Sequence, residues 1–317
     1  IGAERVEPVR VENSTIFVAR GGRRVLEWIY SMQYDALSGE DISELAADLF
    51  EDGIAQIVYQ PSAVVSYGAD PVGILWVRTA AGAVRALTHD RKNKTFAWAP
   101  VDFGGVVESL AVLPGVAGGF DLWLCLKRAG QKRTIEALDV GRAVDGSVVF
   151  ADTHELSLPH LAGTLVRARW GASADAIVGT RIVQLDAQGE AEVSGLEETP
   201  PAYLEAGKEV EWYFTTMPVE VQLGQGTSQG IPKRWTRVAV YLRETAGGVD
   251  LAARERTDRA QRLTAAPAAG QPFTPYTGVK ECKLLGWSEE AQLRISGSEP
   301  LPVTVLGIRG EVELGMG

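Results

Sequence analysis

The sequence has 317 residues, 45% of them hydrophobic, which is enough apolar material for one large domain or two to three ordinary ones. Its 31 basic and 41 acidic residues give a formal net charge of -10. This balance argues against a protein that grips nucleic acid, because phosphate binding needs clustered Lys and Arg. Cys125 and Cys282 are too few for a disulfide framework, so we expect folding in a reducing compartment such as the bacterial cytoplasm.

Short runs rich in β-branched and aromatic residues dominate the first half of the chain, and each is bounded by Gly, Asp, Pro or Asn. Neighbouring runs are separated by only a few residues, which is the spacing of antiparallel meanders and not of βαβ units. The runs are 15–19, 25–30, 54–59, 74–78, 83–88, 95–99, 107–113, 121–126 and 134–140.

One segment, 41–50, has helical periodicity. Its apolar residues fall at 42, 45, 46, 49 and 50, Asp41 and Glu44 are spaced as in a capping box, and Gly53 follows as a stop. We therefore predict one short helix packed on a β scaffold.

A loose repeat recurs along the predicted strands. The runs 15–20, 73–78 and 120–125 are each apolar with an aromatic near the middle, and Trp123 follows Trp76 by 47 residues, close to the length of a four-stranded propeller blade. The sequence thus predicts an all-β protein built from β-propeller-like blades of antiparallel meanders.

The pattern divides the chain into three parts. We expect propeller blades over 1–150 and a small inserted β module over 151–202, which Pro200 and Pro201 close like a linker. Further blades are expected over 203–317, with a long polar loop at about 246–274.

The sequence offers little catalytic chemistry. His89, His154 and His160 lack the ligand spacing of a zinc site, and no Gly-x-Ser-x-Gly elbow is present. Carboxylates are plentiful, but the sequence does not place two of them in one cleft as a glycosidase requires. We expect no catalytic residue, no metal, no cofactor and no apolar run long enough to insert into a membrane.

Two segments are predicted to be contact surfaces. One is the basic turn formed by Arg20, Arg23 and Arg24, which lies between two apolar strands. The other is a glycine-rich loop and the basic pair that follows it. Its candidate residues are Gln225, Thr227, Ser228, Gln229, Lys233 and Arg234. The inserted module is a third candidate surface.

A further set of motifs is notable for its order along the chain. Its members are 16–25, Tyr34-Asp35, 41–46, 53–60, 74–78, Gly82, Leu87-Thr88, 107–109, 114–115, 121–123, Glu136, 224–230, Lys233-Arg234, 276–278, 286–287 and 300–306. In this order, the motifs resemble the tail nozzle proteins of short-tailed bacteriophages, also called tail tubular B or tail stabilization proteins. The resemblance covers most of the chain and is weakest over 151–220 and 246–272.

The resemblance implies a virion structural protein without enzymatic activity, located in the phage tail and made in the bacterial host. It implies a ring, expected to be a hexamer, that contacts an adaptor and a fibre or spike and lets genomic DNA pass without specific binding. Family members are longer, so the chain is expected to match their C-terminal portion.

Two other interpretations remain open. One is a β-propeller module that binds cell-surface glycan or another protein, which clustered exposed aromatics would favour. The other is a glycoside-acting enzyme, which needs two carboxylates roughly 5–10 Å apart in a deep pocket.

Overall fold

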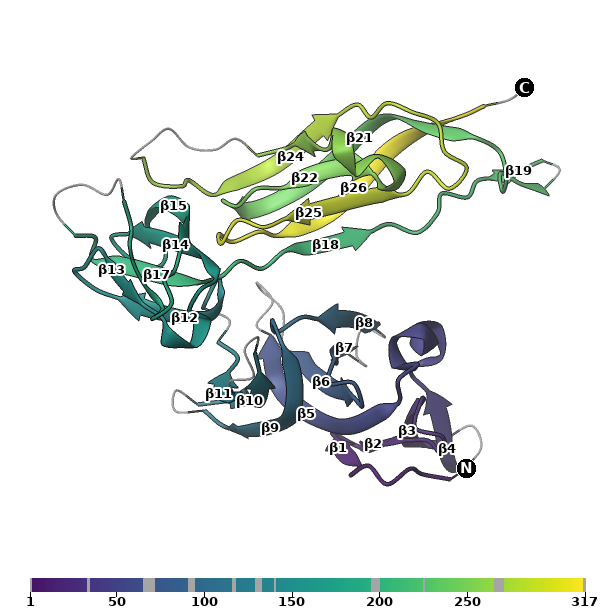
Figure 1. The fold of residues 1–317 in the computed structure, drawn as a ribbon. Coiled ribbons are helices and arrows are strands. Elements are labelled where there is room, and N and C mark those ends of the chain that lie inside the picture. The colour runs from purple at the N-terminus through teal and green to yellow at the C-terminus, as the bar shows by residue number, and fades with distance from the viewer. Residues whose placement is uncertain are drawn as a thin grey trace. The chain divides into compact units, whose positions relative to one another are not determined.

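The computed structural model describes residues 2–32, 35–64, 72–90, 95–115, 118–128, 133–139, 141–194, 200–224, 226–264 and 271–315. The fold is all-β, as predicted, and consists of antiparallel sheets (Figure 1). The chain forms two compact units, Ile1–Val140 and Gly141–Gly317. The predicted first region therefore ends about ten residues earlier than position 150.

Unit 1 contains three sheets in which each strand pairs with its neighbour in sequence, so the predicted meanders are confirmed there. The first sheet consists of β1 (Val9–Val11), β2 (Ser14–Val18), β3 (Val25–Ser31) and β4 (Ala36–Asp41). The second consists of β5 (Ile54–Val64), β6 (Val72–Thr79), β7 (Val84–Asp90) and β8 (Thr95–Val101). The third consists of β9 (Val106–Pro114), β10 (Phe120–Lys127) and β11 (Arg133–Ala137).

The three sheets are stacked, and strand β6 of the second sheet is buried on both faces. Because side chains alternate along a strand, Leu75 and Val77 of β6 pack with the first sheet, while Ile74 and Trp76 pack with the third. All four are at most 9% exposed. The repeat seen in the sequence corresponds to β2, β6 and β10, the second strand of each sheet.

The same backbone contact joins each sheet to the next. The Gly22 carbonyl, in the turn between β2 and β3, accepts a hydrogen bond from the Ile54 N–H at 2.6 Å. One sheet later, the Gly82 carbonyl accepts from the Val107 N–H at 3.0 Å. Both glycines have positive φ, +70° and +84°, which glycine adopts without strain. This recurrence supports a blade-like repeat in unit 1.

The predicted helix is shorter than expected. It is the 3-10 helix η1 (Glu44–Phe50), kinked at Ala46, because Asp41 still belongs to β4. Asp41 does not cap a helix; its Oδ1 accepts from the Ser43 N–H at 2.9 Å. Phe50 is fully buried and meets the ring of Trp98 edge-on at 5.0 Å, which fixes the helix on the second sheet.

Unit 2 begins with the predicted β module, but the module extends beyond 151–202 at both ends. Its main sheet has the order β12 (Asp145–Phe150), β17 (Tyr203–Lys208), β14 (Leu165–Gly171) and β15 (Ile177–Gln184). A two-stranded sheet of β13 (Glu155–Ser157) and β16 (Glu190–Glu192) and the 3-10 helix η3 (Pro159–Leu161) complete it. The flanking strands β12 and β17 pair with each other, so the module includes them.

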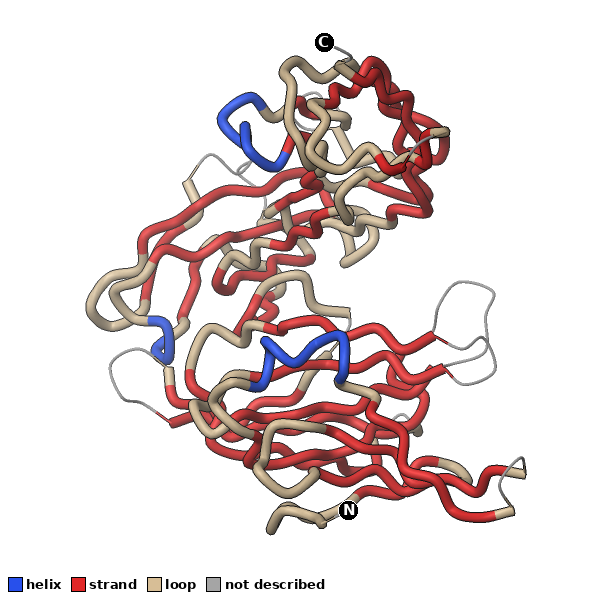
Figure 2. Tube along the Cα trace, turned by 90° about the vertical axis from the view of Figure 1, so that its right-hand side faces the viewer, coloured by secondary structure: helices blue, strands red, loops and turns tan. Residues whose placement is uncertain are grey.

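The C-terminal part of unit 2 differs from the predicted blades. One sheet has the order β18 (Trp212–Thr215), β25 (Leu293–Gly297), β22 (Asp250–Ala253) and β23 (Gln261–Arg262). The other has the order β24 (Tyr276–Cys282), β21 (Lys233–Thr245) and β26 (Val305–Leu314). Strands distant in sequence pair here, and both sheets contribute to a single core, as in a β-sandwich (Figures 1 and 2).

The predicted long loop at 246–274 is also revised. It contains β22, which is paired on both sides, the 3-10 helix η4 (Arg254–Arg259) and β23. Residues 265–270 of this segment lie outside the described part of the chain. A further short hairpin, β19 (Gln222–Leu223) and β20 (Gly226–Thr227), precedes β21.

Candidate functional site

The basic turn is exposed, as predicted. Arg20, Arg23 and Arg24 are all solvent-accessible between β2 and β3. Arg24 lies 3.8 Å from Asp41, an exposed ion pair of the kind that adds little stability. The turn thus combines a structural glycine, Gly22, with guanidinium groups that are available to a partner.

The glycine-rich loop is only partly a surface. Gln225 lies outside the described residues, and Thr227 and Gln229 are exposed. The prediction is wrong for Ser228, which is fully buried. Its hydroxyl accepts from the Val221 N–H at 2.9 Å and its own N–H donates to the Val221 carbonyl at 3.0 Å, so Ser228 closes the hairpin.

Lys233 is not a contact residue either, because only 1% of it is exposed. Its ammonium group donates to the carbonyls of Ile231 at 3.1 Å and Glu289 at 2.6 Å. Two backbone hydrogen bonds with Ser288, at 2.7 and 2.8 Å, fix the same residue. The lysine therefore anchors the start of β21 inside the sandwich.

Arg234 does lie at the surface, where the fold brings it next to the predicted motif Gly286-Trp287. Its guanidinium carbon lies 5.0 Å above the centre of the Trp287 ring, and it forms an ion pair with Glu313 at 2.6 Å. Trp287 is 44% and Leu285 74% exposed. We call Arg234, Leu285 and Trp287 the Trp287 patch. Trp and Arg are enriched among residues that dominate binding energy at protein interfaces.

A second apolar surface lies on the third sheet of unit 1. Along β10, Leu122, Leu124 and Leu126 are buried against the second sheet, so Trp123 projects from the opposite face. On that face, Trp123 lies between Ala111 of β9 and Ala137 of β11, with Leu113 and Ile135 nearby in the register. Ile135 is 77% and Leu113 48% exposed. We call this surface the third-sheet face.

The position of Trp123 matches that of Trp76 in the preceding sheet. Trp76 projects from the second sheet toward the third, where only 4% of it is exposed. Trp123 projects in the same direction, from the second strand of its own sheet. The third-sheet face is therefore equivalent to a face that, one repeat earlier, is covered by another sheet.

A charged pair borders this face. Arg133 donates two hydrogen bonds to Glu108, at 2.8 and 3.0 Å. These bonds hold the pKa of the Glu108 carboxyl below its usual range and raise that of Arg133. The pair gives the apolar face a polar rim, a common arrangement at protein interfaces.

Unit 1 also contains a buried polar cluster that the sequence did not indicate. His89 lies on β7, and its Nε2 is 3.3 Å from Glu27 Oε1. Ser14 Oγ lies 2.5 Å from the same carboxylate oxygen. Because both side chains of the His89–Glu27 pair are at most 2% exposed, this cluster is out of reach of a substrate and joins the first sheet to the second.

A second buried cluster connects the module with the sandwich inside unit 2. Arg169 donates from Nε to Glu205 at 2.7 Å and from Nη1 to the Pro300 carbonyl at 3.3 Å. Tyr203 donates to Glu205 at 2.8 Å. Burial and this bond raise the pKa of Tyr203. Arg169 and Glu205 are 3% and 0% exposed, so the pair has a structural role.

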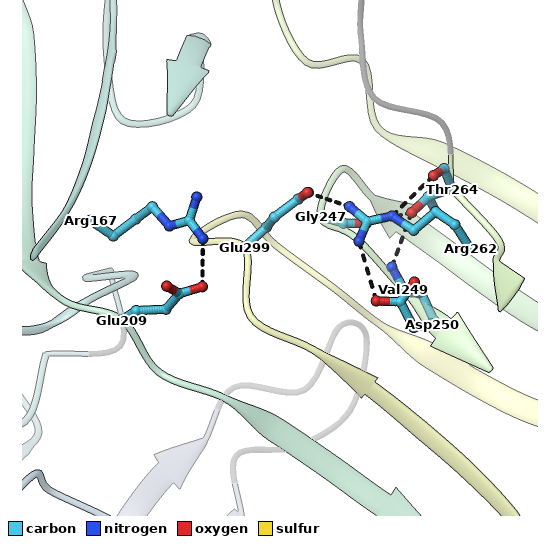
Figure 3. Close-up of polar contacts among 8 residues, drawn as sticks. All are labelled: Arg167, Glu209, Gly247, Val249, Asp250, Arg262, Thr264 and Glu299. Atoms are coloured by element: carbon cyan, nitrogen blue, oxygen red, sulfur yellow. Dashed lines mark hydrogen bonds and ion pairs between the residues drawn. The ribbon is translucent and has the colours of Figure 1, made fainter. Parts of the chain in front are cut away.

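A third polar cluster fixes the β22–β23 hairpin. Arg262 contacts Asp250 at 3.3 Å on one side and Glu299 on the other (Figure 3). Thr264 accepts from the Val249 N–H and donates to the Gly247 carbonyl, both at 3.0 Å. Figure 3 also shows Arg167 bound to Glu209, at 2.5 Å. The guanidinium group of Arg262 is thus paired with carboxylates of the same unit.

Within the described residues, no three His, Cys, Asp or Glu side chains are grouped so that they could hold a metal ion. The part of the chain that the structure describes also has no helix long and apolar enough to cross a membrane.

No family model matches the sequence, and no curated protein matches it. Among solved structures, one described as a glycoside hydrolase aligns over 96% of this chain and 96% of its own, with 9% identity and a TM-score of 0.20. A similarity this low carries no argument about fold or function.

Proposed function

We propose that this protein is a structural component of a bacteriophage tail, a nozzle or tube subunit that acts by assembly and not by catalysis. In this proposal, copies of the chain form a ring, expected to contain six subunits, which contacts an adaptor and a fibre or spike. Genomic DNA passes the acidic protein without specific binding.

Two features support the proposal. The motifs that resemble tail nozzle proteins occupy equivalent places in unit 1, on β2, β6 and β10 and in the turns at Gly22 and Gly82. In unit 2, the motifs at Lys233-Arg234 and Gly286-Trp287 are 53 residues apart (286 − 233) and come together at the Trp287 patch.

The observation that carries the self-assembly part is the third-sheet face. Exposed Leu113 and Ile135 and half-buried Trp123 form an apolar sheet surface of the kind that packs on another sheet elsewhere in unit 1. We infer that a second copy covers it. If the face of one copy packs on a different surface of the next, the contact is head-to-tail, and such contacts generate rings when the rotation closes.

Light scattering after size-exclusion chromatography tests the assembly. We expect the intact chain to elute as an oligomer and Ile135→Lys to shift it to the monomer, because a lysine on this face would have to be desolvated. Leu165→Lys is the matched control, since Leu165 is 59% exposed on β14, outside the third-sheet face. A wild-type chain that remains monomeric at high concentration would refute self-assembly through this face.

Immunogold labelling of purified virions tests the location. Antibody raised against the chain is expected to label the tail. Label confined to the capsid, or absent from virions that contain the protein, would contradict the tail assignment.

A further inference from the structure

The outer face of the sheet β24–β21–β26 contains a hollow of about 90 Å³. This face points away from the sandwich core, because Val238, Val240 and Leu242 of β21 fill the other side. The residues lining the hollow are Arg237, Ala239, Tyr241, Glu281, Arg309, Gly310 and Glu311. Neither the Trp287 patch nor the third-sheet face includes any of them.

Small residues leave space in and beside the hollow. Ala239, in the central strand, lies between Glu281 of β24 and Arg309 of β26. Gly307 pairs with Tyr241, and a Cβ added to Gly307 would meet nothing within 4 Å. The Tyr241 ring therefore does not lie over Gly307. One side of this 36% exposed ring remains open to a ligand.

Four charged groups surround the hollow, and their formal charges cancel. Arg237 binds Glu281 in a bidentate pair, with Nη2–Oε1 at 2.6 Å and Nε–Oε2 at 3.0 Å, which fixes both planar groups. Arg309 is held by its backbone in β26, and its side chain has no hydrogen bond or ion pair with the other residues that the structure describes. Its guanidinium group can therefore donate to a ligand, and the Glu311 carboxylate can accept.

This combination selects the ligand by its chemistry. An anion would meet two carboxylates, and a cation would meet two guanidinium groups, so the balanced set favours a neutral ligand. Planar donors and acceptors suit vicinal hydroxyl groups, and an open aromatic ring suits the C–H face of a sugar. The volume is well below the ~300 Å³ of pockets for drug-sized ligands, so it fits part of one ring.

We propose that this hollow is a subsite for one neutral saccharide unit, with Tyr241 as the stacking platform and Arg309 and Glu311 as the hydroxyl partners. We call it the Tyr241 subsite. The proposal is independent of tail assembly, and either can fail without the other. In a tail protein, such a subsite would contact polysaccharide at the bacterial surface.

Saturation-transfer NMR on the intact chain tests this, with the methyl glycosides of glucose, galactose, mannose and N-acetylglucosamine as probes. We expect transfer to at least one probe, strongest at the ring protons that face Tyr241. Tyr241→Ala should weaken binding roughly tenfold, as expected for loss of a stacking contact. Tyr213→Ala is the control, because Tyr213 is 60% exposed and already lies against Arg294, at 3.7 Å.

Gly307→Val separates loss of the subsite from loss of the fold. The new side chain enters open space beside Tyr241, with which Gly307 pairs, and alters none of the charged groups, so the protein should remain folded while the open side of the Tyr241 ring is covered and binding is lost. Absence of transfer from all four glycosides would overturn the proposal. So would Gly307→Val or Tyr241→Ala binding as well as wild type, or methyl glucuronide binding better than methyl glucoside.

Discussion

The three sheets of unit 1 and the sandwich of unit 2 are all antiparallel, but their strands are connected differently. In unit 1 every strand pairs with its neighbour in sequence. In the sandwich, β18 pairs with β25 and β21 with β26, strands whose nearest ends are 78 and 60 residues apart (293 − 215 and 305 − 245). Local pairing repeats the same short turns, whereas distant pairing requires long connections that cross from one sheet to the other.

The two regions also differ in how their parts are joined. In unit 1, backbone hydrogen bonds from glycine turns join successive sheets, at Gly22 and at Gly82. In unit 2, the buried Arg169–Glu205 pair joins the module to the sandwich through the Pro300 carbonyl. Glycine turns need little more than the correct backbone conformation. A buried ion pair depends on both partners, since either charge alone is costly to bury.

The largest effect is therefore expected at Arg169. Arg169→Met leaves the fully buried Glu205 carboxylate without its cation and should destabilise unit 2 by about 3–5 kcal/mol. Hydrogen exchange of peptides from β14 and β17, followed by mass spectrometry, should show faster exchange throughout the module.

Two further variants make this prediction specific. The double variant Arg169→Met/Glu205→Leu removes both charges and should recover much of the loss. Arg237→Met breaks an ion pair whose side chains are 53% and 46% exposed, and it should cost no more than about 1 kcal/mol. Equal effects of Arg169→Met and Arg237→Met would show that burial does not decide the contribution of an ion pair here.

The second effect concerns the glycine turns of unit 1. Gly82→Ala forces a residue with a Cβ into φ +84° and places that atom 2.4 Å from Val106 Cγ1, so we expect a loss of about 2–4 kcal/mol. Gly118 is the matched control. It has φ +88° but no atom within 4 Å of an added Cβ, so Gly118→Ala should cost only about 1–2 kcal/mol.

Chemical denaturation monitored by hydrogen exchange in β6 and β9 measures this difference. The difference in stability between the two variants reports the cost of separating the second sheet from the third, because an alanine incurs a similar backbone strain at either position. If the two variants were equally stable, the Gly82 contact would not hold the sheets together.

The same contrast explains what the sequence could reveal. Alternation, turn residues and the 47-residue spacing of Trp76 and Trp123 were sufficient for the all-β class and the meanders, because these depend on near neighbours. The sandwich could not be predicted in this way. The segment Asp250–Ala253 falls within the predicted polar loop at 246–274, but it forms the strand β22, which pairs with β25, some forty residues later.

Predictions for individual site residues failed for the same reason, because their environment depends on residues distant in sequence. Lys233 looks like a surface lysine in the sequence, but its ammonium group donates a hydrogen bond to the carbonyl of Glu289, 56 residues away. His89 and Glu27 are 62 residues apart and share no motif. The exposure of Arg23 could be predicted, because an exposed charge needs no distant partner. Trp123 was noted as part of a repeat, but its exposure depends on which face of the sheet is covered.

The smallest effect concerns a turn of unit 2 that the carboxylate of Asp186 stabilises. Asp186 Oδ1 accepts from the N–H groups of Glu190 at 2.8 Å and Gln188 at 2.9 Å. These bonds, first that from Glu190, hold the pKa of the Asp186 carboxyl below its usual value. The folded state thus prefers the carboxylate. Its stabilising contribution is present above the unfolded pKa of about 3.9 and is lost as the pH falls through the lower folded value.

Asp186→Asn keeps an acceptor oxygen but removes the titration. We therefore expect the stability of the hairpin around residues 185–190 to decrease less between pH 5 and about pH 2 in this variant than in wild type. Proton exchange rates of the Glu190 amide, measured by NMR at each pH, report the change.

Asp175→Asn, in the exposed bend before β15, is the control and should leave the pH dependence at Glu190 unaltered. In unit 1 the Ile54 and Val107 N–H groups donate to backbone carbonyls, those of Gly22 and Gly82, so exchange at these two amides should not follow the titration of Asp186. If exchange at Glu190 in Asp186→Asn kept the wild-type pH dependence, the charge of Asp186 would not stabilise the turn. The turns of the two units would then not differ in their dependence on a charged side chain.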